Sequence, residues 1–117
     1  MSTIIYGIKN CDSMKKAMQW LSSEAHSFTF HDYRKDGIDK DMLRTFVNAL
    51  GLDAVLNKRG TTYRKLPEEV KASLTEQSAV ALMLEHEAMI KRPILLHNHS
   101  YHVGFSAAQY HAIFKDA

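Results

Sequence analysis

The chain contains one cysteine, Cys11, which lies between an apolar β-like run, Thr3–Gly7, and a helical pattern that begins directly after it. A cysteine reacts as its thiolate, and the free N–H groups of a helix N-terminus stabilise that anion, as do nearby cations. Lys15 and Lys16 follow within the next turn. This position predicts a nucleophilic thiol whose pKa is lowered from about 8.5 into the range of roughly 3.5–7.5.

The alternative is that Cys11 is a small buried apolar residue, which is the commoner role of a lone cysteine. The polar residues on both sides of it, at positions 9–10 and 12–13, argue against burial. A C-x-x-C motif would place its second thiol at position 14, which is occupied by Met14. Disulfide chemistry in this chain therefore requires a thiol from another molecule, such as glutathione.

The elements around Cys11 form the first part of a sheet. Apolar residues spaced by three and four after Cys11 predict a helix, and the alternating segment 28–33 predicts a second strand. A strand, a helix and a strand within about 30 residues indicate a βαβ unit with parallel strands. Tyr6 and Tyr33 are predicted to lie at the edge of the core.

The rest of the chain adds helices and then a hairpin. Capping and periodicity signals predict several helices within an inserted subdomain at about residues 39–90, starting from Asp39. Segments 94–96 and 101–103 are predicted strands joined by a polar turn, and Ser106 should cap a last helix. The order β-α-β, helices, β-β-α predicts an α/β domain of the thioredoxin-like class. We expect one domain over residues 1–117, with a mixed four-stranded sheet and helices on both faces.

Three separated motifs carry a resemblance to a known family. The segments YGIKNCDSMKKAMQWL, NKRGTTYRKL and IKRPILL resemble, in this order, the arsenate reductase-like ArsC/Spx family and most closely its YffB branch. The resemblance covers nearly the whole chain, from Ile4 to about Phe114. It implies a thioredoxin-like fold with a helical insertion, and a cysteine nucleophile at the end of the first strand, where Cys11 lies.

The resemblance also implies an anion site. Arsenate reductases of this family hold the oxyanion with three arginines, and Arg92 matches one of them, directly before Pro93, which matches the family's cis-proline. The second position falls on Asn57, with Arg59 nearby either as a shifted substitute or as a solvated loop charge. The third falls near Gly104. Because several cations together hold a tetrahedral oxyanion best, these departures argue against arsenate reduction.

We therefore predict a glutathione-dependent thiol reductase in which Cys11 attacks an oxidised or glutathionylated small substrate and glutathione is the co-substrate. The residues expected to bind the substrate or glutathione are Lys9, Asn10, Lys15, Arg59, Arg92 and Pro93. Two alternatives stay open. One is an Spx-like regulatory or binding protein without catalysis, and the other is a true arsenate reductase.

Composition limits the partners. The 117 residues are 45% hydrophobic, as expected of one globular domain, and the net charge of +2 is too small and too dispersed to indicate nucleic acid. No apolar run is long enough for a membrane span, and no secretory signal is recognisable. Several of the seven histidines cluster near residues 97–102, but their spacing offers no ligand set, so we assign no metal. We expect a monomer in the cytoplasm.

Overall fold

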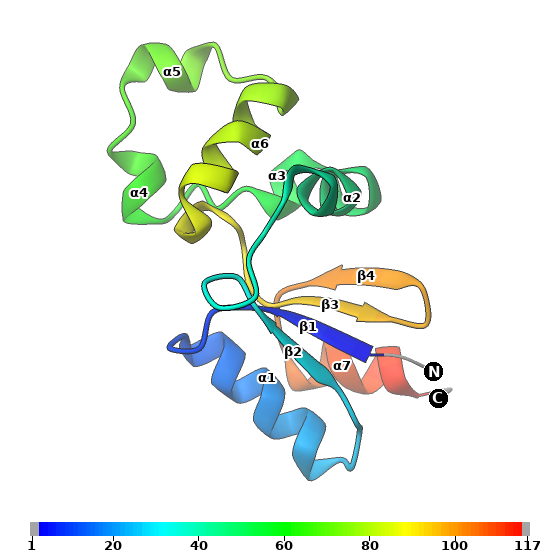
Figure 1. Cartoon of the computed structure of the whole chain (residues 1–117). Helices are drawn as coiled ribbons and strands as arrows, with labels where there is room; N and C mark the ends of the chain where they lie inside the picture. The colour runs from blue at the N-terminus through cyan, green and yellow to red at the C-terminus, as the bar shows by residue number, and fades with distance from the viewer. Residues whose placement is uncertain (1–2, 116–117) are drawn as a thin grey trace. The chain divides into compact units, whose positions relative to one another are not determined.

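The computed structural model describes residues 3–115 and shows two compact units (Figure 1). The first unit runs to Asp36 and resumes at Arg92, and it holds the sheet and two helices. The second unit, Gly37–Lys91, is helical. The chain therefore leaves the sheet after its second strand and returns to it for the third.

The sheet unit begins with the predicted βαβ arrangement. β1 (Thr3–Gly7) and β2 (Thr29–Asp32) are parallel and are joined by α1 (Asp12–Ser23). β3 (Ile94–His97) pairs antiparallel with β1, and β4 (Ser100–Val103) pairs antiparallel with β3. The strand order is β2-β1-β3-β4. This mixed four-stranded sheet confirms the predicted thioredoxin-like fold.

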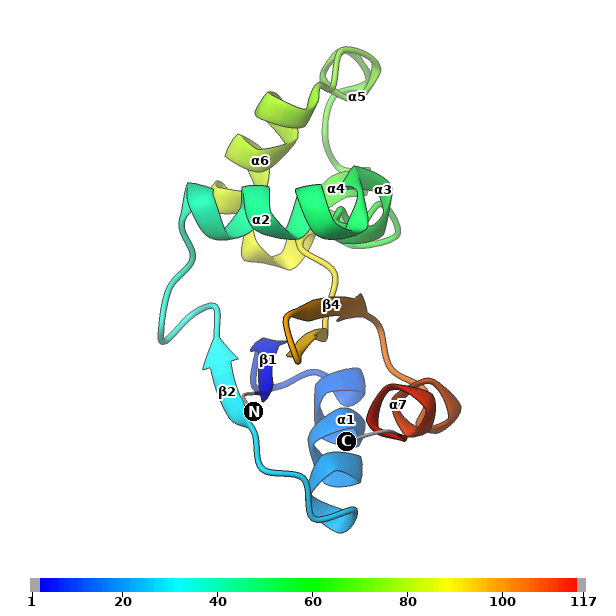
Figure 2. The same ribbon diagram turned by 90° about the vertical axis from the view of Figure 1, so that its right-hand side faces the viewer.

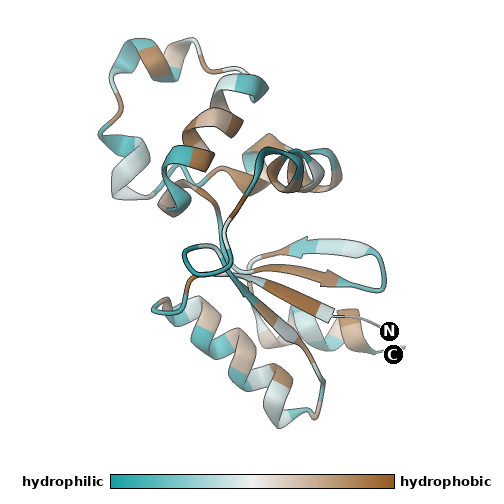
Figure 3. Cartoon of the chain, in the orientation of Figure 1, coloured by the Kyte–Doolittle hydropathy of each residue, from teal (hydrophilic) through white to brown (hydrophobic). Residues whose placement is uncertain are grey.

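The core of this unit lies on one face of the sheet. Both α1 and α7 (Ala107–Phe114) pack against that face, as Figures 1 and 2 show. Within this unit the helices therefore cover one face of the sheet, whereas helices on both faces were predicted. Figure 3 shows β1 and β3 as strongly hydrophobic and the outer strand β4 as more hydrophilic, as expected for central and edge strands. The buried cluster consists of Ile5, Met14, Ala17, Leu21, Leu95, Tyr110 and Phe114.

The second unit is built from short helices with local capping. They are α2 (Lys40–Leu50), α3 (Leu52–Val55), α4 (Thr61–Arg64), α5 (Glu68–Ala72), α6 (Glu76–Glu85) and the 3₁₀ turn η1 (Glu87–Met89). Asp39 caps α2 as predicted, because its carboxylate accepts a hydrogen bond of 2.8 Å from the Met42 N–H. α4 begins at Thr61, within a polar stretch whose composition is typical of a loop.

The hairpin between β3 and β4 closes tightly. Asn98 and His99 form its two-residue loop, with φ angles of 50° and 69°. Two positive φ values in succession match the twist of a two-residue hairpin, and Asn tolerates them well. The turn was predicted, but His97 was expected in its solvated part. His97 instead belongs to β3 and is buried.

Gly7, the last residue of β1, lies against Met14 in the first part of α1. A Cβ atom at position 7 would overlap the Met14 side chain and come within 2.8 Å of its Cε atom. Because Met14 is fully buried, it cannot turn into solvent to make room. The missing side chain at Gly7 therefore allows α1 to start close to the end of β1.

We expect Gly7→Ala to lower the free energy of unfolding by about 1–3 kcal/mol, the usual cost of overpacking a core. Urea denaturation followed by circular dichroism measures this loss. Met14→Ala removes the overlapping atoms, so the double variant should lose less than the sum of the two single variants. Strictly additive losses would show that Gly7 does not accommodate Met14.

His97 is a buried titratable residue of the sheet unit, and its side chain points toward the core. Its Nδ1 atom lies 2.8 Å from the Thr3 hydroxyl, and its ring centroid lies 4.2 Å from that of Phe114. Burial lowers the pKa of His97 below its ordinary value, and the charges of His102 and His26 lower it further. The folded state therefore favours the neutral imidazole.

This lowered pKa makes stability depend on pH. The stability that neutral His97 contributes is complete above about pH 6.5, the unfolded value, and is lost as the pH falls through the lower folded pKa. We expect the Tm to decrease over this range and His97→Gln to flatten the profile in thermal unfolding. His111→Gln, which changes an exposed residue of α7, should keep the wild-type profile. Equal flattening in both variants would assign the pH dependence to other groups.

Candidate active site

Cys11 occupies the N-cap position of α1, as its place in the sequence predicted. Its backbone is extended, with φ −131° and ψ 128°, and its carbonyl accepts the first helical hydrogen bond, 3.0 Å from the Lys15 N–H. The side chain is half-buried and packs against the core cluster beneath α1. The thiol is therefore accessible at one side and supported by apolar atoms at the other.

Arg92 and Pro93 lie directly before β3 in the same unit. The pairing of Tyr6 in β1 with Ile94 in β3 places the end of β1 beside the start of β3. The peptide bond from Arg92 to Pro93 is cis, which confirms the prediction. Pro93 is buried, and its carbonyl accepts a hydrogen bond of 2.9 Å from the Gly104 N–H.

Several groups set the protonation state of the thiol. Burial by itself would raise the pKa of Cys11, but the Met14 N–H, the Arg92 side chain and the Ser13 N–H all stabilise the thiolate. Together they lower the pKa of the thiol below its ordinary value. Within the described chain, the Cys11 side chain makes no capping hydrogen bond of ordinary geometry. The first N–H groups of α1 favour the thiolate through their partial positive charge, as expected at a helix N-terminus.

Tyr33 is a further residue near this site, and it was predicted only to lie at the edge of the core. Its N–H donates a hydrogen bond of 2.8 Å to the Gly7 carbonyl, which extends the parallel pairing beyond β2. The ring is almost fully buried, and burial together with Tyr6 raises the pKa of its hydroxyl, while Arg92 opposes this shift. Tyr33 is thus electrostatically coupled to the arginine that acts on Cys11. The sequence signal that could have placed Tyr33 near the site is its position as the last residue of the predicted strand 28–33.

The structure places the other predicted site residues as follows. Lys9 and Asn10 lie in the turn before Cys11 and Lys15 lies in the first turns of α1, all three with exposed side chains. Arg59 belongs to the second unit, where it lines a pocket with other cations. Lys9, Asn10 and Lys15 are therefore in the same unit as Cys11 and Arg92, whereas Arg59 belongs to the other unit.

The described residues offer neither a metal site nor a membrane-spanning helix. Between residues 3 and 115, no three His, Cys, Asp or Glu side chains gather in a way that could hold a metal ion. None of the described helices has the length and apolar character needed to cross a bilayer.

Comparison with known proteins gives a consistent family match. The family model described as "ArsC family" matches residues 6–113. The solved structure of the YffB protein is 46% identical, with a TM-score of 0.88 over 95% of this chain and 97% of that chain. The solution structure of an arsenate reductase (ArsC) related protein from Brucella melitensis is 49% identical, with a TM-score of 0.80 over 98% of this chain and 96% of that chain.

Curated relatives extend this picture. An uncharacterised protein of Haemophilus influenzae is 43% identical over 94% of this chain and 96% of its own length. The global transcriptional regulator Spx of Streptococcus agalactiae is 26% identical over 83% of this chain and 72% of its own length. The matched relatives therefore include a transcriptional regulator as well as proteins related to arsenate reductases.

The contact with Arg92 predicts how the thiol titrates. Arg92→Gln removes a cation that favours the thiolate, so we expect the pKa of Cys11 to rise toward its ordinary value and alkylation at neutral pH to slow. The rate of iodoacetamide alkylation against pH measures both effects. Lys115→Gln, at the far end of α7, removes an exposed cation and should leave the midpoint unchanged. If Arg92→Gln leaves the midpoint unchanged, the helix N–H groups and not Arg92 stabilise the Cys11 thiolate.

Proposed function

Because the chain belongs to the ArsC family, we propose that it is a glutathione-dependent thiol reductase that uses Cys11 as its only nucleophile. The observation that carries the proposal is the half-buried thiol at the N-cap of α1, where Arg92 and the N–H groups of Met14 and Ser13 favour the thiolate. A thiol in this setting forms its thiolate at a lower pH than an ordinary cysteine does. With one cysteine in the chain, the second thiol of the reaction comes from glutathione.

The first step transfers glutathione to the protein. The Cys11 thiolate attacks the glutathione sulfur of a mixed disulfide between the substrate and glutathione. A new S–S bond forms between Cys11 and glutathione, the original S–S bond breaks, and the substrate leaves as a thiolate that takes a proton from water. The electron pair of the Cys11 thiolate thus reduces the substrate sulfur.

The second step regenerates the protein. The thiolate of a second glutathione attacks the glutathione sulfur bound to Cys11, so that oxidised glutathione forms and Cys11 leaves as a thiolate. A thiol of lowered pKa is a good leaving group, so the contacts that favour the first step also favour this one. The net reaction reduces one mixed disulfide and oxidises glutathione.

The residues around Cys11 have separate roles in this proposal. Arg92 stabilises the thiolate and pairs with a carboxylate of glutathione, while Pro93, whose carbonyl is bonded to the Gly104 N–H, fixes the start of β3 from which Arg92 extends. Lys9, Asn10 and Lys15 form the polar rim of the thiol site, where glutathione carboxylates are attracted from solvent. We place the reaction in the cytoplasm, where glutathione is kept reduced.

Arsenate reduction is the second candidate, favoured by the family match, but two local features argue against it. Asn57, at the position of a family arginine, accepts a hydrogen bond of 3.2 Å from the Arg59 N–H and so stabilises its own turn. Gly104, at the position of another, has a φ of 82°, where a residue with a side chain is strained. Neither position supplies a cation.

A regulatory function without catalysis is the third candidate, favoured by the similarity to Spx. A protein that only binds a partner does not require a thiolate at neutral pH. Turnover of a glutathionylated substrate therefore separates this candidate from the reductase, because a binding protein would show none.

We expect incubation with oxidised glutathione to add one glutathione to Cys11, as measured by intact mass. Cys11→Ser should abolish the adduct with the fold intact by circular dichroism. Arg92→Ala should slow adduct formation roughly tenfold, since a charge-assisted contact contributes about 1.5–3 kcal/mol. Arg44→Ala, which removes an exposed arginine of α2, serves as the matched control and should react at the wild-type rate.

The same preparations should show weak or no arsenate turnover with glutathione present. Robust arsenate turnover without a glutathione adduct would reverse the ranking of the two activities. An adduct that forms but is not resolved by added glutathione would favour the regulatory candidate, because the protein would then respond to oxidation without turning over.

A further inference from the structure

Three cations of the second unit surround one pocket. Lys58, Arg59 and Lys91 line it together with Asp53 and Leu56, and its volume is about 320 Å³. This volume lies at the lower end of the range of roughly 300–1,000 Å³ that is usual for small-molecule sites. We refer to these five residues as the cation pocket. All of them lie within Gly37–Lys91, so the pocket is a property of the second unit alone.

The backbone holds the two sides of the cation pocket together. Leu56 and Ile90 form an antiparallel bridge. The Asn57 N–H donates to the Met89 carbonyl at 2.8 Å, and the Lys91 N–H donates to the Val55 carbonyl at 2.7 Å. The segment that carries Lys58 and Arg59 is thus hydrogen-bonded to the segment that carries Lys91. These backbone hydrogen bonds therefore bring the three cations together.

The turn that carries Lys58 and Arg59 is fixed in a second way. The Asn57 side-chain oxygen accepts from the Arg59 N–H at 3.2 Å. A Cβ atom at Gly60 would lie 2.9 Å from the Asn57 side-chain nitrogen, so the amide packs against a position that has no side chain. Asn57 therefore shapes the turn from which Lys58 and Arg59 line the pocket.

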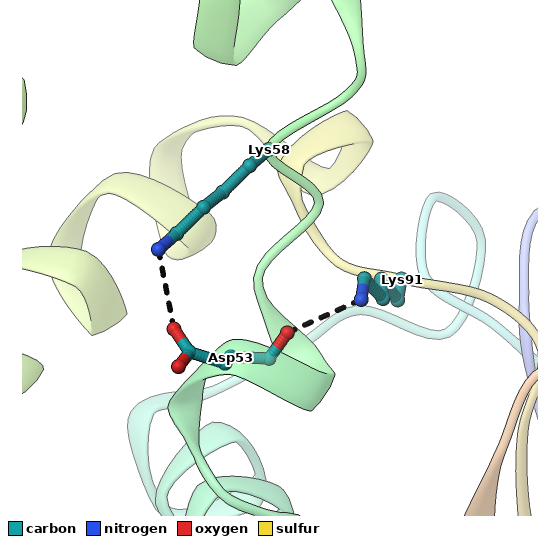
Figure 4. Close-up of polar contacts among 3 residues, drawn as sticks. All are labelled: Asp53, Lys58 and Lys91. Carbon is teal, nitrogen blue, oxygen red and sulfur yellow. Dashed lines mark hydrogen bonds and ion pairs between the residues drawn. The ribbon is translucent and has the colours of Figure 1, made fainter.

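Asp53 contacts both lysines but carries the charge to neutralise only one of them. Its carboxylate lies 3.1 Å from the Lys58 ammonium, and its carbonyl accepts from the Lys91 ammonium at 3.1 Å (Figure 4). The carbonyl carries no net charge, so three cations face one carboxylate and the cation pocket carries a net charge of +2. The Asp53 side chain is 91% exposed and that of Lys58 50% exposed, so their ion pair is weak and can yield to a ligand.

We propose that the cation pocket binds a small organic dianion, a phosphate ester or a dicarboxylate, through Lys58, Arg59 and Lys91. Arg59 offers the fork of donors that pairs with a planar carboxylate or a phosphate, and Lys91 supplies a half-buried positive charge. Leu56 is fully buried beneath the pocket, so the ligand is held by the charged groups above it. Binding here does not require the Cys11 thiol.

The experiment is an NMR titration of the ¹⁵N-labelled full chain at constant ionic strength, with phenyl phosphate and succinate as the dianions and acetate as the monoanion. We expect saturable shifts at residues 56–60 and at Lys91 for the dianions, and much weaker ones for acetate. Arg59→Gln should weaken binding about tenfold. Tighter binding of phenyl phosphate would identify a phosphate ester as the ligand, and tighter binding of succinate a dicarboxylate.

Two controls make the result decisive. Lys65→Gln removes an exposed cation of the same unit that does not line the cation pocket, and Cys11→Ser removes the thiol. Both should bind like the wild type. The proposal is overturned if neither dianion gives saturable shifts at millimolar concentration, if Lys65→Gln weakens binding as much as Arg59→Gln does, or if Cys11→Ser abolishes it. Loss of glutathione chemistry with dianion binding retained would refute the proposed reductase alone.

Discussion

The pairing of β1 with both of its neighbours is the constraint on which the candidate site depends. β1 is parallel to β2 and antiparallel to β3, with Tyr6 opposite Ile94. This register places the turn that follows β1, with Cys11 in it, beside the residues that precede β3. A slip by one residue would turn every side chain of a strand to the opposite face. Such a slip would therefore expose the core and would also move Arg92 away from the thiol.

The thiol itself reflects a balance of opposing effects. Deeper burial would raise its pKa, and full exposure would screen the helix N–H groups and Arg92 with water. Cys11 is half-buried, with the core cluster beneath it, and the groups that favour the thiolate outweigh the cost of burial. Gly7 contributes to this balance indirectly, because its missing side chain lets α1 begin close to the sheet.

Local signals predicted much of the fold. The cap at Asp39, the hairpin turn before β4 and the apolar spacing of α1 depend on residues a few positions apart, and the structure confirms them. The family resemblance supplied Arg92 and Pro93, which no spacing rule connects to Cys11. His97 and Tyr33 were missed because their surroundings are long-range: Thr3 lies 94 residues before His97 in sequence, and a polar segment gives no sign of the strand register that buries it.

The cation near Cys11 bears on the choice between the proposed thiol–disulfide exchange and the reduction of an oxyanion. An oxyanion next to a thiolate brings further negative charge to the sulfur, so several cations must converge there. Among the described residues that shift the pKa of Cys11, the cation is Arg92. A neutral disulfide adds no charge at the sulfur, so one arginine and the N–H groups of a helix suffice. The charges near Cys11 thus favour thiol–disulfide exchange on electrostatic grounds that are independent of the family match.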